Sequence, residues 1–390
     1  MRGRRAPLRM AQVRQTSPRI VAGLMTGTSM DGLDMALVRL EAGEPRAFEL
    51  LASDVAPMPD ELRQALRPQG ELVLAQAMRL DQALGRWFAD ALEAFVDRCG
   101  ITPQLIGSHG QTVFHEHGVT TCQLGEPAWA AARLGCPVVS DFRRNDIVLG
   151  GCGAPLVPIV DRWLLGDPSR MVVAVNIGGI ANLTAVPATE HGQNAPVTGF
   201  DTGPGNMVLD SLARGLTQGR LTCDLDGELA ARGRVDERLL AQLLEEPFFA
   251  RPPPRSAGRE DFGEAFTARL VAAKAPRGEQ DWLDLLATAV ELTIRPLAGA
   301  IRDLVPASGP PARVLVSGGG ADNPFLMDRL QDELRPLTVE RMEAGGISSA
   351  FKEAIAFALL ASARIDEVLV DLRSITGSSE SQLLGKITEC

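Results

Sequence analysis

The stretch that decides how the chain folds is residues 20–38, IVAGLMTGTSMDGLDMALV. Its first five residues and residues 35–38 are apolar and partly β-branched, which is typical of buried strands. A glycine-bearing turn at residues 27–32 separates them, and glycine lets main-chain N–H groups approach a ligand closely. The stretch therefore predicts a strand–turn–strand hairpin whose loop faces a ligand.

Two more glycine-rich turns follow apolar, β-branched runs farther along the chain. They are NIGGIAN at residues 176–182 and SGGGADN at residues 317–323. One such turn is weak evidence for a nucleotide, because ordinary hairpins also contain glycine. Three turns at similar intervals predict a nucleotide that is clamped between two similar domains.

The composition indicates a folded globular protein. A chain of 390 residues is long enough for two domains of ordinary size, and its net charge of −10 argues against a general nucleic-acid binder. Its apolar runs are interrupted well before the ~18 residues that a membrane span needs. The six cysteines form no CxxC pair and predict mostly buried thiols in a reducing compartment.

The two halves of the chain follow one plan, in which strands flank a glycine turn and helices follow. In the first half we expect helices at residues 60–99 and 127–134, and strands at residues 105–108 and 137–140. In the second half we expect strands at residues 171–176, 181–186 and 314–316, and helices at residues 234–244, 262–273, 283–304 and 352–363. This plan predicts an α/β protein of two RNase H-like domains, of the actin, hexokinase and Hsp70 type, with an interdomain ATP cleft.

The expected domain boundaries follow from this plan. Residues 1–19 are rich in arginine and predict a disordered basic tail, or a stretch upstream of a true start at Met10, with a transit peptide as the alternative. The N-terminal domain is expected to comprise residues 20–168 together with residues 350–390, which return to it as a C-terminal helix. Residues 169–349 are expected to form the second domain.

The first turn is neither a Walker A loop, because it lacks the lysine, nor a nucleophile elbow, because Asp31 stands where a glycine is needed. Its N–H groups, with Thr28 and Ser29, could hold β- and γ-phosphates while Asp31 or Asp34 acts through Mg²⁺. An ordinary glycine hairpin is the alternative. The third turn lacks the Gly-x-Gly-x-x-Gly pattern, so we expect it to lie against the adenosine, with Asn323 opening the next helix.

The segment FDTGPGN at residues 200–206 places one carboxylate at the end of a short strand. A kinase of this plan needs a carboxylate that takes the proton from the attacking oxygen, which makes Asp201 the predicted base. The alternative is an aspartate that caps a turn.

Two further groups of polar residues lie in the first half of the chain. Arg143, in DFRRND at residues 141–146 before the apolar loop 150–158, has the fork that suits a ligand carboxylate; a solvated surface turn is the alternative. His109, His115 and His117 do not match the His-Glu-x-x-His pattern of zinc proteases, which disfavours a metal role.

Taken together, these segments resemble one family, the anhydro-N-acetylmuramic acid kinases of bacterial cell-wall recycling. The resemblance extends from about residue 21 to residue 387, with the motifs in the order of the family. The matching blocks are GTSMDGLD at 27–34, SHGQT at 108–112, DFR at 141–143 with Asp146, GGCGAPLVP at 150–158, and residues 176–184, 199–206, 317–324 and 352–361.

The resemblance implies an enzyme that uses ATP and Mg²⁺ to open 1,6-anhydro-N-acetylmuramic acid. Water adds at C1 and O6 is phosphorylated, giving N-acetylmuramic acid 6-phosphate and ADP, with Asp201 as the base for the water. It also implies a cytoplasmic homodimer that binds neither nucleic acid nor membrane. The implied ATP-binding residues are Gly27, Thr28, Ser29, Met30, Asp31, Gly32, Leu33, Asp34, Asn176, Gly178, Gly179, Gly318, Gly319, Gly320 and Asn323. The implied sugar-binding residues are His109, Gln111, Arg143 and Glu353, and the metal ligands stay open.

Two segments depart from the family pattern. Residues 255–260 are RSAGRE where the family usually has KSTGRE, and residues 371–378 are DLRSITGS where NLPxVTGA is common. We expect neither segment to touch the proposed base or the phosphate loops. The alternatives are another sugar or carboxylate kinase of the same superfold, and a non-catalytic ATP switch such as actin.

Overall fold

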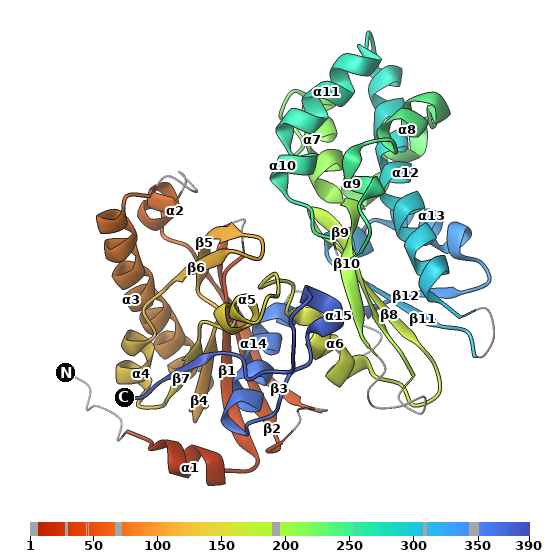
Figure 1. Cartoon of the computed structure of the whole chain (residues 1–390). Helices are drawn as coiled ribbons and strands as arrows, with labels where there is room; N and C mark the ends of the chain where they lie inside the picture. The colour runs from red at the N-terminus through yellow and green to blue at the C-terminus, as the bar shows by residue number, and fades with distance from the viewer. Residues whose placement is uncertain are drawn as a thin grey trace. The chain divides into compact units, whose positions relative to one another are not determined.

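The computed structural model describes residues 7–27, 30–43, 45, 47–66, 72–188, 196–253, 255–306, 310–342 and 351–390. The chain divides into two compact units (Figure 1). Unit 1 comprises Met1–Leu164 and Ala350–Cys390, and unit 2 comprises Leu165–Ser349.

Unit 1 is built on a six-stranded sheet with the order β13-β7-β4-β1-β2-β3. Its strands are β1 (Arg19–Met25), β2 (Gly32–Leu40), β3 (Glu49–Pro57), β4 (Leu105–Ser108), β7 (Val138–Ser140) and β13 (Lys386–Thr388). Strands β1, β2 and β3 are antiparallel, whereas β4 and β7 continue the sheet in parallel with β1. The predicted hairpin around the first glycine turn is therefore confirmed.

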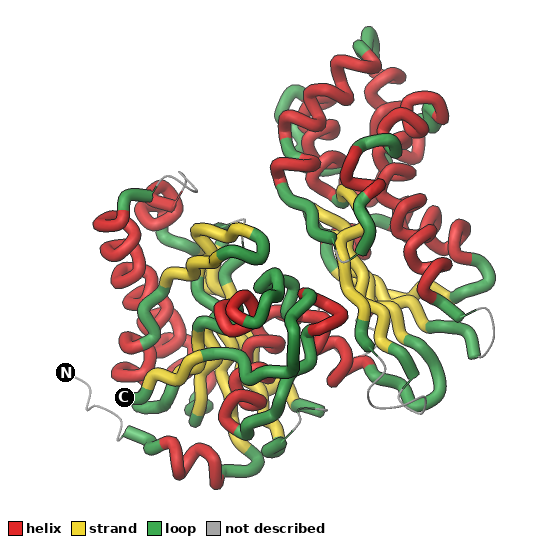
Figure 2. Tube along the Cα trace, in the orientation of Figure 1, coloured by secondary structure: helices red, strands yellow, loops and turns green. Residues whose placement is uncertain are grey.

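Helices cover both faces of this sheet (Figure 2). The helices of unit 1 are α1 (Met10–Gln15), α2 (Asp60–Leu66), α3 (Leu74–Cys99), α4 (Ala128–Leu134), α5 (Arg144–Val148), α6 (Val157–Leu165), α14 (Lys352–Ile365) and α15 (Arg373–Thr376). The apolar stripe of α3, with Leu84, Phe88 and Leu92, belongs to the same buried core as Leu24 of β1. A separate two-stranded sheet, β5 (Gln111–Glu116) and β6 (Thr120–Leu124), follows β4.

Helix α14 covers the opposite face at unusually close range. Gly23 of β1 and Gly107 of β4 are direct neighbours in the parallel pairing. A Cβ added at Gly23 would lie 1.8 Å from the Ala354 carbonyl oxygen, and one at Gly107 would lie 2.1 Å from the Phe357 carbonyl oxygen. Because glycine has no side chain, the main chain of α14 rests directly on the sheet.

Unit 2 repeats the strand order of unit 1. Its five-stranded sheet has the order β10-β9-β8-β11-β12, with β8 (Val172–Ile177), β9 (Ile180–Val186), β10 (Thr198–Pro204), β11 (Arg313–Ser317) and β12 (Thr338–Arg341). Strands β8, β9 and β10 are antiparallel, and β11 and β12 continue in parallel with β8. Three antiparallel strands followed by two parallel ones in each unit confirm the predicted α/β fold of two RNase H-like units.

The helices of unit 2 surround the long helix α12 (Glu279–Leu304). The others are α7 (Asn206–Thr217), α8 (Glu237–Leu243), α9 (Pro247–Ala250), α10 (Arg259–Phe262), α11 (Glu264–Lys274) and α13 (Pro324–Leu334), with short 3-10 turns η2 (Leu225–Gly227), η3 (Ala230–Arg232) and η4 (Gly319–Asp322). Pro296 lies inside α12, as expected from the sequence. Helix α7 was not predicted.

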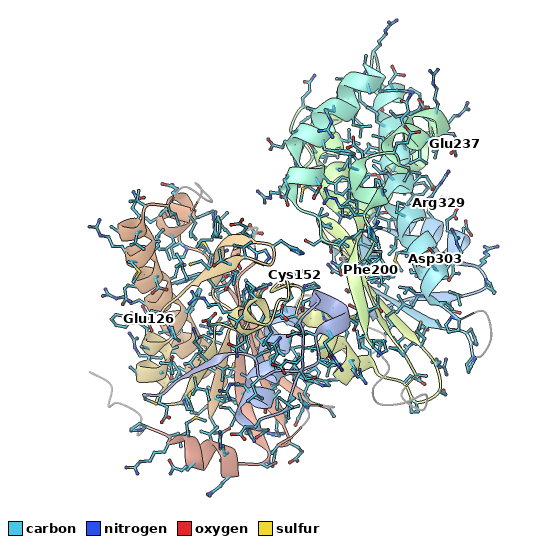
Figure 3. The ribbon with its side chains drawn as sticks, viewed as in Figure 1. Glu126, Cys152, Phe200, Glu237, Asp303 and Arg329 are labelled. Carbon is cyan, nitrogen blue, oxygen red and sulfur yellow. The ribbon has the colours of Figure 1, made fainter. Side chains whose placement is uncertain are left out.

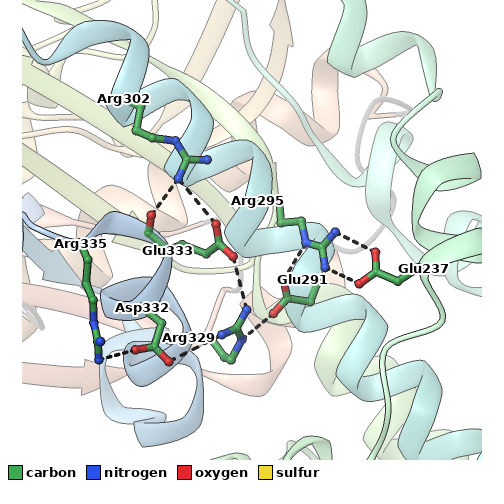
Figure 4. Close-up of polar contacts among 8 residues, drawn as sticks. All are labelled: Glu237, Glu291, Arg295, Arg302, Arg329, Asp332, Glu333 and Arg335. Carbon is green, nitrogen blue, oxygen red and sulfur yellow. Dashed lines mark hydrogen bonds and ion pairs between the residues drawn. The ribbon is translucent and has the colours of Figure 1, made fainter. Parts of the chain in front are cut away.

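An ion-pair network joins three of these helices on the surface of unit 2. It includes Glu237 of α8 and Arg329 of α13 (Figure 3). At its centre Glu291 of α12, whose side chain is only 2% exposed, accepts from Arg295 Nε at 2.8 Å and from Arg329 Nε at 2.7 Å (Figure 4). A buried carboxylate between two guanidinium groups holds α12 against α13.

Two expectations differ from the structure. Residues 1–6 lie outside the described residues, but α1 and the start of β1 show that the expected disordered tail is wrong for residues 10–15 and for Arg19. Val13 is buried, and Arg19 is fully buried and pairs with Asp366 at 2.6 Å, a partner too distant in sequence to be foreseen. Of the six free cysteines only Cys136 is buried, so the expectation of mostly buried thiols is also wrong. The expected helical region at residues 60–99 contains the two helices α2 and α3.

No helix among the described residues combines the length and apolar character that a membrane crossing requires.

Candidate active site

The first glycine turn joins β1 to β2 at the end of β1. The Gly27 carbonyl accepts the N–H of Met30 at 3.2 Å, which closes the turn, and Met30 adopts a left-handed φ of 58°. Thr28 and Ser29 lie outside the described residues. Asp31 is exposed, whereas the Leu33 side chain is buried in the core, so Leu33 can offer a ligand only its main chain.

Asp34, on β2, has a raised pKa next to the first glycine turn. Burial and the negative charges of Glu353 and Asp31 raise the pKa of Asp34 to about 6. A cation placed among these carboxylates would relieve their repulsion, and carboxylate oxygens are ligands that Mg²⁺ prefers. Mg²⁺ in kinases is commonly coordinated by one or two carboxylates together with phosphate oxygens, and the carboxylates present here match that ligand set.

Arg143 and His109 form a connected pair. Arg143 Nε donates to His109 Nε2 at 2.9 Å, and Arg143 Nη1 donates to the Gly153 carbonyl at 3.0 Å. His109 Nδ1 lies 2.8 Å from the Gly110 carbonyl oxygen. A guanidinium only donates and a carbonyl only accepts, so His109 is neutral with its proton on Nδ1. Burial and the Arg143 charge accordingly lower the pKa of His109 well below its usual range.

The predicted role of His109 changes with this geometry. Its ring is 3% exposed and packs on Phe357 with ring centroids 4.6 Å apart. Both ring nitrogens are occupied, so His109 orients Arg143 and does not itself reach for a ligand. Burial lowers the pKa of Arg143 to about 10, with Glu353 and Asp146 acting in the opposite direction, so the guanidinium stays charged at neutral pH.

The segment that carries Arg143 is not a solvated surface turn. Asp146 is fully buried and accepts the Gly153 N–H at 2.7 Å. Its other oxygen accepts Thr376 Oγ1 at 2.7 Å and Gln382 Nε2 at 3.0 Å. The alternative of a surface turn is therefore wrong, because the C-terminal residues cover this loop.

Gln111 and Glu353 differ in exposure. Gln111 is 1% exposed, and its Nε2 donates to the Gly27 carbonyl at 3.4 Å, so it supports the first turn. Its Oε1 is buried and finds no partner among the described residues. Glu353 is exposed in the first turn of α14. Desolvation of its carboxyl by the surrounding protein raises its pKa, whereas the positive charges of Arg143 and Lys352 lower it.

Asp201 lies inside β10, opposite Asn182 of β9 and beside a bulge. Its Oδ2 accepts the Ala257 N–H at 2.7 Å. Burial raises the pKa of Asp201 to about 6, although the Ala257 N–H and Arg255 lower it. Asp201 does not cap α7, since Gly205 holds the position before that helix. The Thr-Gly that follows Asp201 belongs to β10 and not to a turn, and the Asp201 carboxylate bonds a segment that is distant in sequence.

The same contacts overturn one expectation about the 255–260 segment. We expected this segment not to touch the proposed base, but Ala257 bonds its carboxylate and Arg255 bonds its main chain at 3.0 Å. The Ala257 contact uses the main-chain N–H, so alanine serves as well as the threonine usual in the family. Sequence reasoning missed Arg255 and Ala257 because β10 and this loop are far apart along the chain.

The second and third glycine turns lie at the carboxyl ends of the neighbouring parallel strands β8 and β11. Gly179 and Gly319 are exposed there. Gly318 has a φ of +81°, and a Cβ on it would lie 2.7 Å from the Ile177 carbonyl oxygen, so this position favours glycine. The carboxyl edge of parallel strands is where ligands bind in open α/β sheets.

Several residues of these turns also have structural roles. The Gly178 and Gly179 carbonyls accept the N–H groups of Asn206 at 2.7 Å and Gly205 at 2.9 Å, which fixes the start of α7. Asn323 caps α13, as predicted, because its Oδ1 accepts the Leu326 N–H at 3.0 Å. Asn176 Oδ1 lies 3.5 Å from Ser317 Oγ, which links the second turn to the third. A Cβ on Gly320 would lie 2.4 Å from the Ile177 side chain.

The described residues contain no group of three or more His, Cys, Asp or Glu side chains that could hold a metal ion.

A sequence model described as anhydro-N-acetylmuramic acid kinase matches residues 19–390. The chain belongs to the anhydro-N-acetylmuramic acid kinase family. Relatives of that description are similar over nearly their whole length. The protein from Caldanaerobacter subterraneus subsp. tengcongensis is 37% identical over 97% of this chain and 99% of its own. The protein from Streptomyces coelicolor is 41% identical over 94% of this chain and 93% of its own.

Solved structures are similar at lower identity. Component A of (R)-2-hydroxyglutaryl-CoA dehydratase from Acidaminococcus fermentans has a TM-score of 0.43 at 11% identity, covering 89% of this chain and 99% of its own. The ROK hexokinase from Thermus thermophilus has a TM-score of 0.36 at 16% identity, covering 89% and 99%.

Proposed function

We propose that the protein is an ATP-dependent kinase that opens 1,6-anhydro-N-acetylmuramic acid with water and phosphorylates O6. The products are N-acetylmuramic acid 6-phosphate and ADP. Membership of the family supports the reaction class. The observation that carries the mechanism is Asp201, a half-buried carboxylate with one oxygen held by the Ala257 N–H and a pKa raised to about 6. Such a group is a competent base near neutral pH, where it is mostly ionised.

In the proposed mechanism Asp201 takes a proton from the water that attacks C1. The C1–O6 bond breaks as the new C1–O bond forms, and O6 attacks the γ-phosphorus of ATP. Capture by the phosphoryl group makes O6 a better leaving group than a bare alkoxide. Positioning and charge neutralisation supply most of the acceleration in phosphoryl transfer, so the protein chiefly holds the reactants in line.

The nucleotide and metal roles of the other predicted residues rest on the family resemblance. The main chain around Gly27 and Gly32, with Thr28 and Ser29, is proposed to bind phosphates. Asp34 and Asp31 would hold Mg²⁺, which, when bound, neutralises charge on the phosphate oxygens. The remaining proposed nucleotide contacts are Met30, Leu33, Asn176, Gly178, Gly179, Gly318, Gly319, Gly320 and Asn323.

Arg143 is proposed to bind the carboxylate of the sugar's lactyl group, because its planar fork matches a carboxylate. His109 holds that fork in place, Gln111 supports the first turn, and Glu353 contacts the sugar. The family resemblance further supports a homodimer that works in the cytoplasm, in peptidoglycan recycling. These finer assignments all belong to the proposal.

The decisive test is mass spectrometry of products formed with Mg-ATP in ¹⁸O-water. We expect a 6-phosphate from 1,6-anhydro-N-acetylmuramic acid carrying one ¹⁸O at C1, and none from N-acetylmuramic acid. N-acetylmuramic acid 6-phosphate incubated alone corrects for exchange at C1. Absence of product from the anhydro sugar would refute the substrate and favour another sugar or carboxylate.

The Asp201→Asn variant tests the base separately. Asparagine keeps the size of the side chain but cannot take a proton at neutral pH, so ATP should still bind while turnover falls by about 10² or more. Calorimetric titration with ATP measures the first quantity and the product assay measures the second. Turnover equal to that of the wild type would remove Asp201 from the role of base.

A further inference from the structure

Residues 255–257 bond three polar groups of Asp201, and the mechanism above gives the two contacts of Arg255 no role. The Asp201 N–H donates to the Arg255 carbonyl at 3.0 Å, and Arg255 Nε donates to the Asp201 carbonyl at 3.0 Å. The Ala257 N–H donates to Asp201 Oδ2 at 2.7 Å. In the sheet as described, β10 is an outer strand that pairs with β9. The 255–257 segment therefore occupies the free edge of the strand that carries the base.

The Arg255 side chain ties this segment to the loop that precedes it. Its Nη1 donates to the carbonyls of Phe249 at 3.0 Å and Arg251 at 2.9 Å. Its guanidinium carbon lies 4.9 Å from the centre of the Phe248 ring and 5.7 Å from that of Phe200. A planar fork with three bonds to main-chain carbonyls and two aromatic neighbours has little freedom to move. Arg255 thus joins the 249–255 loop to β10.

The positive charge of Arg255 acts on Asp201 and not on an ion-pair partner among the described residues. Within the described residues Arg255 forms no ion pair, since its side-chain hydrogen bonds go to neutral carbonyls. Arg251, on the same loop, pairs instead with Asp261 at 3.2 Å. The carboxyl of Asp201 is thus the acidic group whose charge Arg255 senses.

The hydrogen bond from Ala257 distinguishes the two carboxylate oxygens of Asp201. Oδ2 accepts the Ala257 N–H, whereas Oδ1 accepts no hydrogen bond from the residues that the structure describes. Resting on the proposed role of Asp201 as base, we propose that Arg255 is a positioning residue. It holds residues 255–257 so that Ala257 fixes Oδ2 and the proton of the attacking water goes to Oδ1.

Four effects set the pKa of Asp201. Burial raises its pKa most, the Ala257 N–H and Arg255 lower it, and Asp261 raises it. Loss of the Arg255 charge therefore raises the pKa of Asp201 further. The fraction of enzyme with an ionised base then falls at a given acidic pH. The acidic limb of the pH–rate profile should consequently move to higher pH.

The test compares the pH profiles of kcat/KM for Arg255→Met, Arg255→Lys and Arg251→Met. Arg255→Met removes the fork and the charge, so kcat should fall about tenfold or more, with the acidic limb moved up by about half a pH unit or more. Arg255→Lys keeps the charge and should leave the limb near its wild-type position. Arg251→Met removes a charge from the same loop and leaves Asp261 without this partner, so the limb should move less than in Arg255→Met, while kcat should stay within about twofold of the wild type.

Several outcomes would overturn the inference. One is that Arg255→Met keeps the wild-type kcat and the wild-type position of the acidic limb. Another is that Arg251→Met moves the acidic limb as far as Arg255→Met does. If Arg255→Met does not fold, Arg255→Gln carries the same pH test, because it also lacks the charge. The KM for ATP should stay within about twofold in every variant, since the phosphate loops are untouched. If Asp201→Asn is inactive while Arg255→Met behaves as wild type, only the positioning role fails; turnover in Asp201→Asn would refute the proposed base itself.

Discussion

Replacing Gly107 by alanine should push helix α14 away from the sheet of unit 1. The new Cβ would lie 2.1 Å from the Phe357 carbonyl oxygen and 2.9 Å from the Ala361 Cβ, whereas ordinary contacts begin near 3.4 Å. The neighbour at the shortest distance is main chain, which cannot rotate away. The helix must therefore retreat by about 1 Å, a gap that forfeits a quarter to a half of the dispersion energy of the atoms involved.

We expect this strain to lower the free energy of unfolding by about 3 kcal/mol, the upper part of the usual range for overpacked cores. For a unit of this size the midpoint of thermal unfolding should fall by roughly 6–12 °C. Gly23→Ala should cost more, because its Cβ would lie only 1.8 Å from the Ala354 carbonyl oxygen. The kcat/KM for the sugar should fall as well, since α14 carries Glu353.

Scanning calorimetry measures the unfolding midpoints of Gly107→Ala and Gly23→Ala. Gly299→Ala is the matched control, because Gly299 lies in α12 with nothing within 4 Å of an added Cβ. There alanine should raise stability by up to about 1 kcal/mol through helix propensity. A midpoint for Gly107→Ala within about 2 °C of the wild type would refute the close contact on which this reasoning rests.

Three further predictions concern charge. Glu291→Gln should lower the free energy of unfolding by about 1–3 kcal/mol in urea titrations, because its arginine partners lose a buried counter-charge (Figure 4). The exposed Glu237→Gln is the control and should lower it by less than about 1 kcal/mol. Equal losses in the two variants would contradict this prediction. With an Asp201 pKa of about 6, kcat/KM should fall as the pH drops below 6, whereas a flat profile down to pH 5 would argue against an ionised base. The Asp34 pKa is raised from 3.8 to about 6, so the folded state binds this proton more tightly and stability falls as pH rises through that window. Asp34→Asn should therefore gain stability over the wild type at pH 7.5 but not below pH 4, as measured by urea titration at both values.

Local patterns account for the parts of the fold that the sequence predicted. Apolar runs beside glycine turns identified β1, β2, β8, β9 and β11, since strand and turn preferences act over a few neighbouring residues. The apolar stripe of α3 and the cap at Asn323 are equally local signals. Asp201 was predicted from its residue type and from family motifs, and the structure adds the hydrogen bond and burial that shape its chemistry.

Contacts between distant segments account for what the sequence could not predict. Helix α7 begins where the Gly178 and Gly179 carbonyls accept its first N–H groups, a partnership invisible in residues 206–217 alone. The burial of Asp146 depends on Thr376 and Gln382, more than 200 residues away in sequence. Arg255 resembles any loop arginine until β10 is placed beside it.

The position of α14 along the chain has a consequence for biosynthesis. Unit 1 consists of two separate stretches of chain, and α14 and β13 leave the ribosome only after all of unit 2. At ~5–20 residues per second, the sheet face that Gly23 and Gly107 shape for α14 stays uncovered for on the order of ten seconds or more. Unit 2 is continuous and can fold in that interval. The nascent chain thus completes its inserted unit first and exposes an apolar sheet face that chaperones can bind until the final helix arrives.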